Sequence, residues 1–345
     1  MGTNPIIEAL EPLRRLSRDL RKAAATLSRG EARYLVDSYY QMQDDRKRAD
    51  SQVKSLGTSE EPHEVLSWLG ANTEMLEKNI RSALGVYAAA NPVGQWSLSI
   101  LGIGPVMSAG LLAHIDIEKA PTVGHIWRFA GLDPTREWLG TKKATEAVEL
   151  VLDLSGSKVV DQKIVGACAS HLHLNEATVL KMATVDFGTG EIKKLTKASL
   201  IKALAKRPWS ANLKVLCWKI GESFVKIKGK EESLYGALFV DRWAYEQKRN
   251  DAGELADQAK AKLEKFNIGK NTDAYKAYSA GRLPPAHILA RAKRWTAKLF
   301  LAHWHHVAYE VRYKTQPPKP YVLTHLGHAH EITVPNWPVG SGAWH

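Results

Sequence analysis

Cysteine is nearly absent from this chain, which has only Cys168 and Cys217, and they stand far apart in the sequence. Without a Cys-x-x-Cys pair, neither a disulfide framework nor a zinc ribbon is expected. Long hydrophobic runs are missing too, since no segment approaches the roughly eighteen consecutive apolar residues of a membrane span. The start, MGTNPIIEALEPLRRL, carries acidic residues and lacks the apolar core of a signal peptide. We therefore expect a cytoplasmic protein with no membrane partner.

Acidic residues are in the minority. The chain has 48 Lys and Arg against 36 Asp and Glu, with a formal net charge of +12. This balance favours a polyanionic partner, and eleven Trp and eleven Tyr offer faces on which unpaired bases stack. A metal-dependent nuclease needs several carboxylates converging on its metal ions. Before Gln95 we find no β-rich run with an isolated Asp at a strand end, so we expect no nuclease domain, no catalytic residue and no cofactor.

The stretch from Leu98 to Pro134 has the layout of a helix-hairpin-helix turn. In the run Gly102-Ile103-Gly104-Pro105, two glycines permit a tight turn and the proline suits the first position of the next helix. The amides at that helix start would face a phosphate, at the positive end of the helix dipole. Pro121-Thr122 begins a second helix, which Gly131 and Pro134 end. The alternative is a helix corner that holds no ligand.

The runs IGPVMSAGLLAHI and APTVGHIWRFAGLDP resemble the C-terminal domain of the IS110 and IS116 transposases. They are also similar to the Nop domain of box C/D ribonucleoprotein proteins. The family that joins these features without a transposase catalytic domain is that of the TIGR-associated (Tas) proteins, RNA-guided DNA-targeting proteins of phages and bacteria. The resemblance covers residues 98–134 and, more weakly, 208–313. It implies a guide RNA and a target DNA as partners.

Candidate binding residues follow from both arguments. We expect Gly102, Gly104 and Pro105 to shape the phosphate cradle. The Nop resemblance implies that Thr122, His125 and Arg128 contact an RNA kink, although Gly124-His125 departs from the usual Nop pattern. Further residues are expected to line the nucleic-acid backbone, most of them cations that would neutralise it: Lys142, Lys143, Lys206, Arg207, Trp209, Lys214, Arg291, Arg294 and Lys298.

The expected fold is mainly α, with an N-terminal helical, coiled-coil-like arm over residues 1–92. Its two helices each carry an apolar seam with heptad-like spacing. The first seam is Leu35, Tyr39, Met42, Arg46, Ala49, Val53 and Leu56; the second is Leu66, Leu69, Thr73, Leu76, Ile80, Ala83 and Tyr87. A turn near residues 59–62 would join them as an antiparallel hairpin. The seams predict self-association into a homodimer, with a bundle inside one chain as the alternative.

The nucleic-acid-binding domain is expected over residues 93–143 and 207–315. A small helical insert over 144–206 would interrupt it, and 316–345 would be an extended tail. Within the insert, Asn175 and Thr196 are candidate helix caps. The turn Leu172-His173-Leu174-Asn175 resembles that of a helix-turn-helix. Such an insert is either a packing module or a DNA reader.

Residues 233–265 are predicted to form one long polar helix, and Pro284-Pro285 to open a last helix reaching Tyr313. On that helix Arg291, Arg294 and Lys298 form a basic stripe. We expect this stripe to share a groove with the turn Gly102–Pro105, which we call the glycine corner. His303, His305 and His306 are expected to contact phosphates or core carbonyls. The tail histidines, His325, His328 and His330, offer a metal site as the less favoured alternative.

The sequence thus favours an RNA-binding, RNA-guided DNA-targeting protein without its own nuclease domain, in a phage or mobile-element ribonucleoprotein. One alternative is a divergent IS110-type transposase or recombinase. After the AGLDP motif, however, the chain departs from that family, and no spacing selects Ser155, Ser157 or Ser210 as a nucleophile. A second alternative is a DNA-binding accessory protein that uses no RNA.

Overall fold

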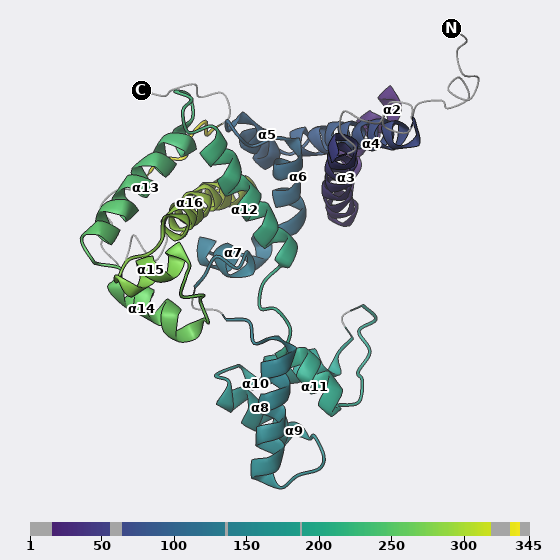
Figure 1. Ribbon diagram of the computed structural model, residues 1–345. Helices are drawn as coiled ribbons and strands as arrows, with labels where there is room; N and C mark the ends of the chain where they lie inside the picture. The colour runs from purple at the N-terminus through teal and green to yellow at the C-terminus, as the bar shows by residue number, and fades with distance from the viewer. Residues whose placement is uncertain (1–15, 56–63, 135–136, 187, 319–331, 339–345) are drawn as a thin grey trace. The chain divides into compact units, whose positions relative to one another are not determined.

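A computed structural model gives the fold of residues 16–55, 64–134, 137–186, 188–318 and 332–338 (Figure 1). As predicted, this described part is mainly α-helical; outside the helices, one antiparallel bridge joins Val185 to Ile192. The chain divides into two compact units, one of Met1–Trp127 with Val215–His345 and one of Arg128–Lys214. The predicted insert, 144–206, lies inside the second unit.

The arm is a helical hairpin of α3 (Arg29–Ser55) and α4 (Glu64–Ala89), preceded by α2 (Arg18–Ala23) and the short helix η1 (Ala24–Thr26). The seam position Arg46, where a charge interrupts the apolar spacing, pairs with Glu77 of α4 at 2.8 Å. Val36 and Leu84 are buried between the two helices. The same apolar cluster includes Val106 from outside the arm. Val36 and Leu84 stand outside the predicted seams, whereas the seam residues Leu35, Tyr39, Ile80 and Tyr87 are partly buried and pack against this cluster.

That helix is α6 (Pro105–His114), which follows α5 (Pro92–Ser99) across the glycine corner and precedes η3 (Ile117–Lys119) and α7 (Val123–Phe129). Pro105 stands at the start of α6 with Gly104 as its N-cap, which confirms the predicted helix start. At the other end, Arg33 of α3 donates to the carbonyl of Ala113 at 3.0 Å. At its start, a Cβ added to Gly85 of α4 would lie 3.6 Å from the Pro105 ring, so both ends of α6 are close to the arm.

The remaining helices of the first unit are α12 (Ala211–Lys226), α13 (Leu234–Asp251), α14 (Ala256–Lys265), α15 (Asp273–Ser279) and α16 (Pro285–Tyr313). In Figure 1, α16 lies inside the curve that α12 to α15 make. The core of this unit is aromatic: the rings of Trp96, Phe224 and Tyr235 each pack against the ring of Phe300 in α16. The predicted single helix over 233–265 is wrong: the chain breaks after Asp251, where Gly253 adopts φ +80°, and α14 begins at Ala256.

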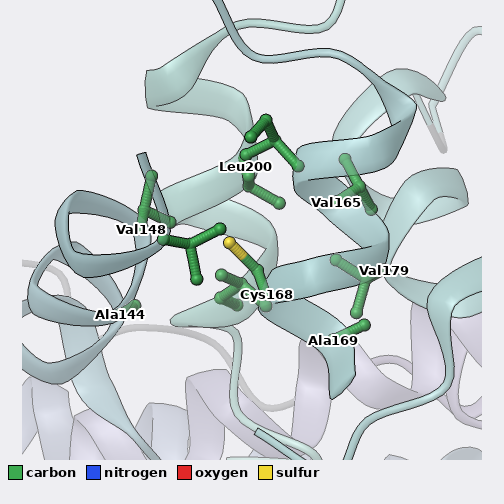
Figure 2. Close-up of a cluster of buried hydrophobic side chains, with 10 residues drawn as sticks. Ala144, Val148, Val165, Cys168, Ala169, Val179 and Leu200 are labelled. Carbon is green, nitrogen blue, oxygen red and sulfur yellow. The ribbon is translucent and has the colours of Figure 1, made fainter. Parts of the chain in front are cut away.

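The second unit holds α8 (Gly140–Ser155), α9 (Gln162–His171), α10 (Glu176–Thr184) and α11 (Lys197–Leu204). Figure 2 shows Val148, Cys168 and Leu200 among the side chains that meet in its apolar core. Asn175 caps α10 and Thr196 caps α11, as predicted. The unit therefore has a hydrophobic core of its own.

Candidate nucleic-acid interface

Only one of the two glycines in the glycine corner has a backbone conformation that requires glycine. Gly102 adopts φ +93°, and a Cβ there would lie 2.7 Å from Cδ1 of Ile227. Ser223 of α12 holds the turn by donating to the carbonyl of Gly102 at 2.6 Å. Gly104 has extended backbone, φ −94°, and a Cβ there would meet no atom within 4 Å. Gly102 is required by the turn, whereas Gly104 stands beside open space.

That open space belongs to a pocket of about 450 Å³ at the start of α6. The arm helices α3 and α4 form one side of it, and α12 forms another. Its lining combines aromatic, cationic and backbone groups: Tyr39, Tyr40, Gln43, Lys47, Arg81, Gly104, Pro105, Val106, Met107, Trp218, Lys219, Glu222, Ser223 and Lys226. We call it the cationic pocket, because four basic side chains and one carboxylate line it.

Cations outnumber carboxylates among the side chains that line the cationic pocket, although Lys47 also pairs with Asp44 at 3.6 Å. The pocket's carboxylate, Glu222, forms an ion pair with Lys293 of α16. The ammonium of Lys219 stands 3.9 Å from the centre of the Tyr40 ring. Burial lowers the pKa of Lys219, and the like charges of Lys47 and Lys226 lower it further, while the carboxylate of Asp44 partly opposes them. An anion bound between these lysines would relieve that repulsion.

Stacking surface is present in the same pocket. Trp218 is 60% exposed although it is a large apolar side chain. Aromatic faces beside cations are the combination that holds unpaired bases together with their phosphates. The cationic pocket is therefore chemically suited to a nucleic-acid strand.

The basic stripe of α16 does not share this pocket. Arg291 donates to Glu246 of α13 at 2.8 Å and to Gln258 of α14 at 2.6 Å. Lys298 stands 4.2 Å from the ring centre of Trp127 in α7. Burial, followed by the charge of Arg291, lowers the pKa of Arg294. Arg291 thus contacts α13 and α14, and Lys298 contacts α7, whereas the glycine corner lines a pocket with α3, α4 and α12. None of the three stripe residues lines that pocket, contrary to the expected common groove.

Thr122 and His125 lie together at the start of α7. The Thr122 hydroxyl and Nδ1 of His125 are 3.0 Å apart, and His125 is exposed. Neither residue lines the cationic pocket. If they contact RNA as the Nop resemblance implies, they do so at a separate point.

The other predicted residues belong to the second unit. Arg128 pairs with Asp133 at 3.2 Å. Two cation–aromatic contacts stand near the ends of the unit, Arg207 over Trp138 at 4.4 Å and Lys214 over Trp209 at 4.2 Å. The remaining cations, Lys142, Lys143 and Lys206, are exposed.

Sequence reasoning missed the arm's contribution to the site. Lys47 and Arg81 come from helices that were assigned to self-association, and Trp218 was not singled out. One signal was available for α12, where Lys219 and Lys226 lie off its apolar face. The arm residues gave no such signal, because their place beside the glycine corner depends on how α6 packs against α3 and α4.

Of the three histidines near the middle of α16, two contact backbone carbonyls, as predicted. His305 Nε2 lies 2.9 Å from the carbonyl oxygen of Ala120, and His303 Nε2 lies 2.9 Å from that of Ile332. His306 instead lies 3.1 Å from Glu310. In the described residues no three His, Cys, Asp or Glu side chains gather closely enough to hold a metal ion. The tail histidines, residues 325–330, lie outside the described residues.

No described helix is long and apolar enough to cross a lipid bilayer. Comparison with protein families gives one finding, a match of residues 97–148 to the model of the IS116/IS110/IS902 family transposases. This segment includes the glycine corner, α6, α7 and the first part of α8. Searches among curated proteins and among solved structures find no match.

Proposed function

We propose that this protein binds nucleic acid through the cationic pocket and that its ligand there is a structured guide RNA, used to target DNA. The observation that carries the proposal is the pocket itself. Four cations and exposed Trp218 surround the start of α6, with one carboxylate that is already paired. The positive end of the α6 dipole adds to this field.

The family match supports the choice of nucleic acid over other polyanions. The matched segment, 97–148, contains Gly104, Pro105, Val106 and Met107, so the transposase-like region supplies one wall of the pocket, while the four cations and Trp218 lie outside it. The choice of RNA rests on the resemblance of this same segment to the Nop domain and to the Tas proteins. It is supported chemically by the stacking surface, since unpaired bases are commoner in folded RNA than in duplex DNA.

The decisive experiment is fluorescence anisotropy with a labelled RNA hairpin that carries single-stranded flanks. Replacing Lys47, Arg81 and Lys226 together by Ala is expected to weaken binding at least tenfold and to reduce the slope of log affinity against log salt by about two. The control variant, with exposed Lys248, Lys260 and Lys270 replaced by Ala, loses the same net charge. Equal affinities for the two variants would refute the pocket as the RNA site.

A homodimer is the second part of the proposal. Val65, Trp68 and Leu69, near the start of α4, are all exposed although they are apolar. Clustered apolar side chains on a helix surface favour association. We propose that two copies pair through this part of the arm.

The alternative function is a divergent IS110-type transposase or recombinase, which the family match itself favours. Magnesium-dependent cleavage of a DNA strand by the purified chain, abolished by changing a single serine or carboxylate, would establish it. Binding without cleavage under the same conditions favours the guide-holding protein.

A further inference from the structure

The second unit contains a short corner between two helices. α9 ends at His171 and α10 begins at Glu176, with a turn of four residues, Leu172–Asn175, between them. His173 adopts the left-handed conformation at φ 52°, between two half-buried leucines. Asn175 then caps α10, since its side-chain oxygen accepts from the amide of Thr178 at 2.9 Å. A short turn that joins two helices sharing a core is found in helix-turn-helix motifs.

The two helices pack closely on their inner sides. Cys168 and Ala169 of α9 and Val179 of α10 are buried in the core that Figure 2 shows. The carboxylate of Glu176 folds back onto α9, where a Cβ added to Gly166 would lie 3.0 Å from it. The carboxylate of Glu176 therefore lies against α9 and not on the outer side of α10.

The outer side of α10 is left to solvent. Ala177 and Lys181, one helical turn apart, are both exposed, and Thr178 beside them is exposed as well. This face carries a small apolar side chain, a hydroxyl and a cation. Such groups suit base edges: alanine contacts the thymine methyl group and lysine donates to guanine.

A hairpin follows α10 at once. The Asp186 amide donates to the carbonyl of Glu191 at 2.9 Å, next to the bridge between Val185 and Ile192. Lys193, which pairs with Asp186, and Lys194 are exposed on the segment that returns toward α11. Cations on a hairpin beside a helix-turn-helix are placed to contact the phosphates that flank a groove.

The charge of the unit agrees with a polyanionic partner. Residues 128–214 contain fourteen Lys and Arg against nine Asp and Glu. We propose that this unit binds duplex DNA, with the outer side of α10 in the major groove and the hairpin lysines on the backbone. This site goes beyond the proposed function because it lies in the other unit and needs no bound RNA.

The test measures binding of a short duplex to the full chain after nuclease treatment has removed co-purified nucleic acid. Ala177→Asp puts a negative charge on the groove-facing side, in a helix turn where the dipole favours that charge, so folding is not weakened. Ala198→Asp is the matched control, because Ala198 is also the exposed second residue of a capped helix in the same unit. Near it, Lys197 of α11 is held by Glu149 of α8 at 3.0 Å.

Ala177→Asp is expected to weaken duplex binding about tenfold or more, and Ala198→Asp to leave it within about twofold. Lys194→Ala is expected to weaken binding and to lower the salt slope by about one, and Lys260→Ala to do neither. Circular dichroism confirms that each variant is folded. Equal effects of the two Asp variants, or none from either, would overturn the assignment.

The two proposed sites are separable in the same assays. Ala177→Asp is expected to leave affinity for the RNA hairpin unchanged, and the triple variant of the cationic pocket to leave duplex affinity unchanged. If Ala177→Asp instead abolishes RNA binding and spares duplex binding, the outer side of α10 takes RNA and the DNA assignment is wrong.

Discussion

The ammonium of Lys219 lies 3.9 Å from the centre of the Tyr40 ring, which joins α12 to the arm helix α3 at the edge of the cationic pocket. A cation held over an aromatic face is stabilised by the ring, by about 0.5–1 kcal/mol at exposed sites. Here burial and the neighbouring Lys47 and Lys226 oppose the charge and lower the pKa of Lys219, although Asp44 raises it. The pocket therefore places this cation beside other cations, an arrangement that attracts an anionic ligand.

Replacing Lys219 by Met tests whether its charge serves RNA binding and not folding. The apolar stem is kept and the charge removed, so the lost ring contact and the relieved repulsion offset each other. We expect the free energy of unfolding, from urea titration, to change by less than about 1 kcal/mol. RNA affinity is expected to fall several-fold. A large loss of stability with unaltered RNA affinity would mean that the side chain is structural.

The two glycines of the corner are expected to respond differently to Ala. Gly102→Ala forces a side chain into positive φ and against Ile227, at a cost of about 2 kcal/mol or more. Gly104→Ala meets neither obstacle and is expected to change stability by less than about 0.5 kcal/mol. Urea denaturation of both variants measures the difference. Equal stabilities would show that the turn does not depend on Gly102.

Glu246 is expected to be the most sensitive carboxylate in the first unit. It is 1% exposed, and Arg291 lies 2.8 Å and Arg249 3.9 Å from it, with Arg242 also paired to it. Glu246→Ala would leave these cations without their shared partner, at a cost of about 3–5 kcal/mol. Glu254→Ala is the control, because this partner of Arg249 is half exposed and its pair is worth about 1 kcal/mol or less. Similar melting temperatures for the two variants would contradict the network.

Stability is expected to fall at acidic pH partly because of His303. Burial lowers its pKa to about 4, and its ring contacts Tyr235 at 2.6 Å. In the unfolded chain the pKa is about 6.5, so the contribution is complete above that pH and is lost as the pH falls toward about 4. Thermal melts over this range, repeated with His303→Gln, are expected to show a shallower dependence in the variant. The remaining slope has other sources, among them His287, whose pKa burial also lowers to about 4. Identical slopes would exclude His303.

Self-association is expected to depend on the exposed apolar residues of α4. Light scattering should give the mass of two chains for the unaltered protein and of one chain for a variant with Trp68→Glu and Leu69→Glu. These side chains are already in solvent, so the substitutions are expected to leave helicity unchanged. A monomeric unaltered protein would remove the dimer from the account.

Local signals predicted the local structure well. Pro105 after Gly104 set the start of α6, and Asn175 and Thr196 capped the helices that they were predicted to cap. These features depend on a few neighbouring residues, so they are readable from the sequence. Gly253 was overlooked, and its positive φ accompanies the break that separates α13 from α14.

The site was less predictable because it depends on distant contacts. Arg291 looks in the sequence like a free member of a basic stripe, yet it is held by a glutamate 45 positions away. Lys47 and Arg81 look like ordinary surface charges of a coiled coil. They line the cationic pocket only because α6 packs against both arm helices, a tertiary arrangement that no spacing within the arm reveals.

The most direct test is the nucleic acid that the protein carries when it is purified under low salt. We predict that extraction yields material sensitive to ribonuclease, resistant to deoxyribonuclease and uniform in length. The variant with Lys47, Arg81 and Lys226 replaced by Ala should carry little of it, while the variant with Lys248, Lys260 and Lys270 replaced should carry as much as the unaltered protein. Finding no RNA, or finding equal amounts on both variants, would contradict the account.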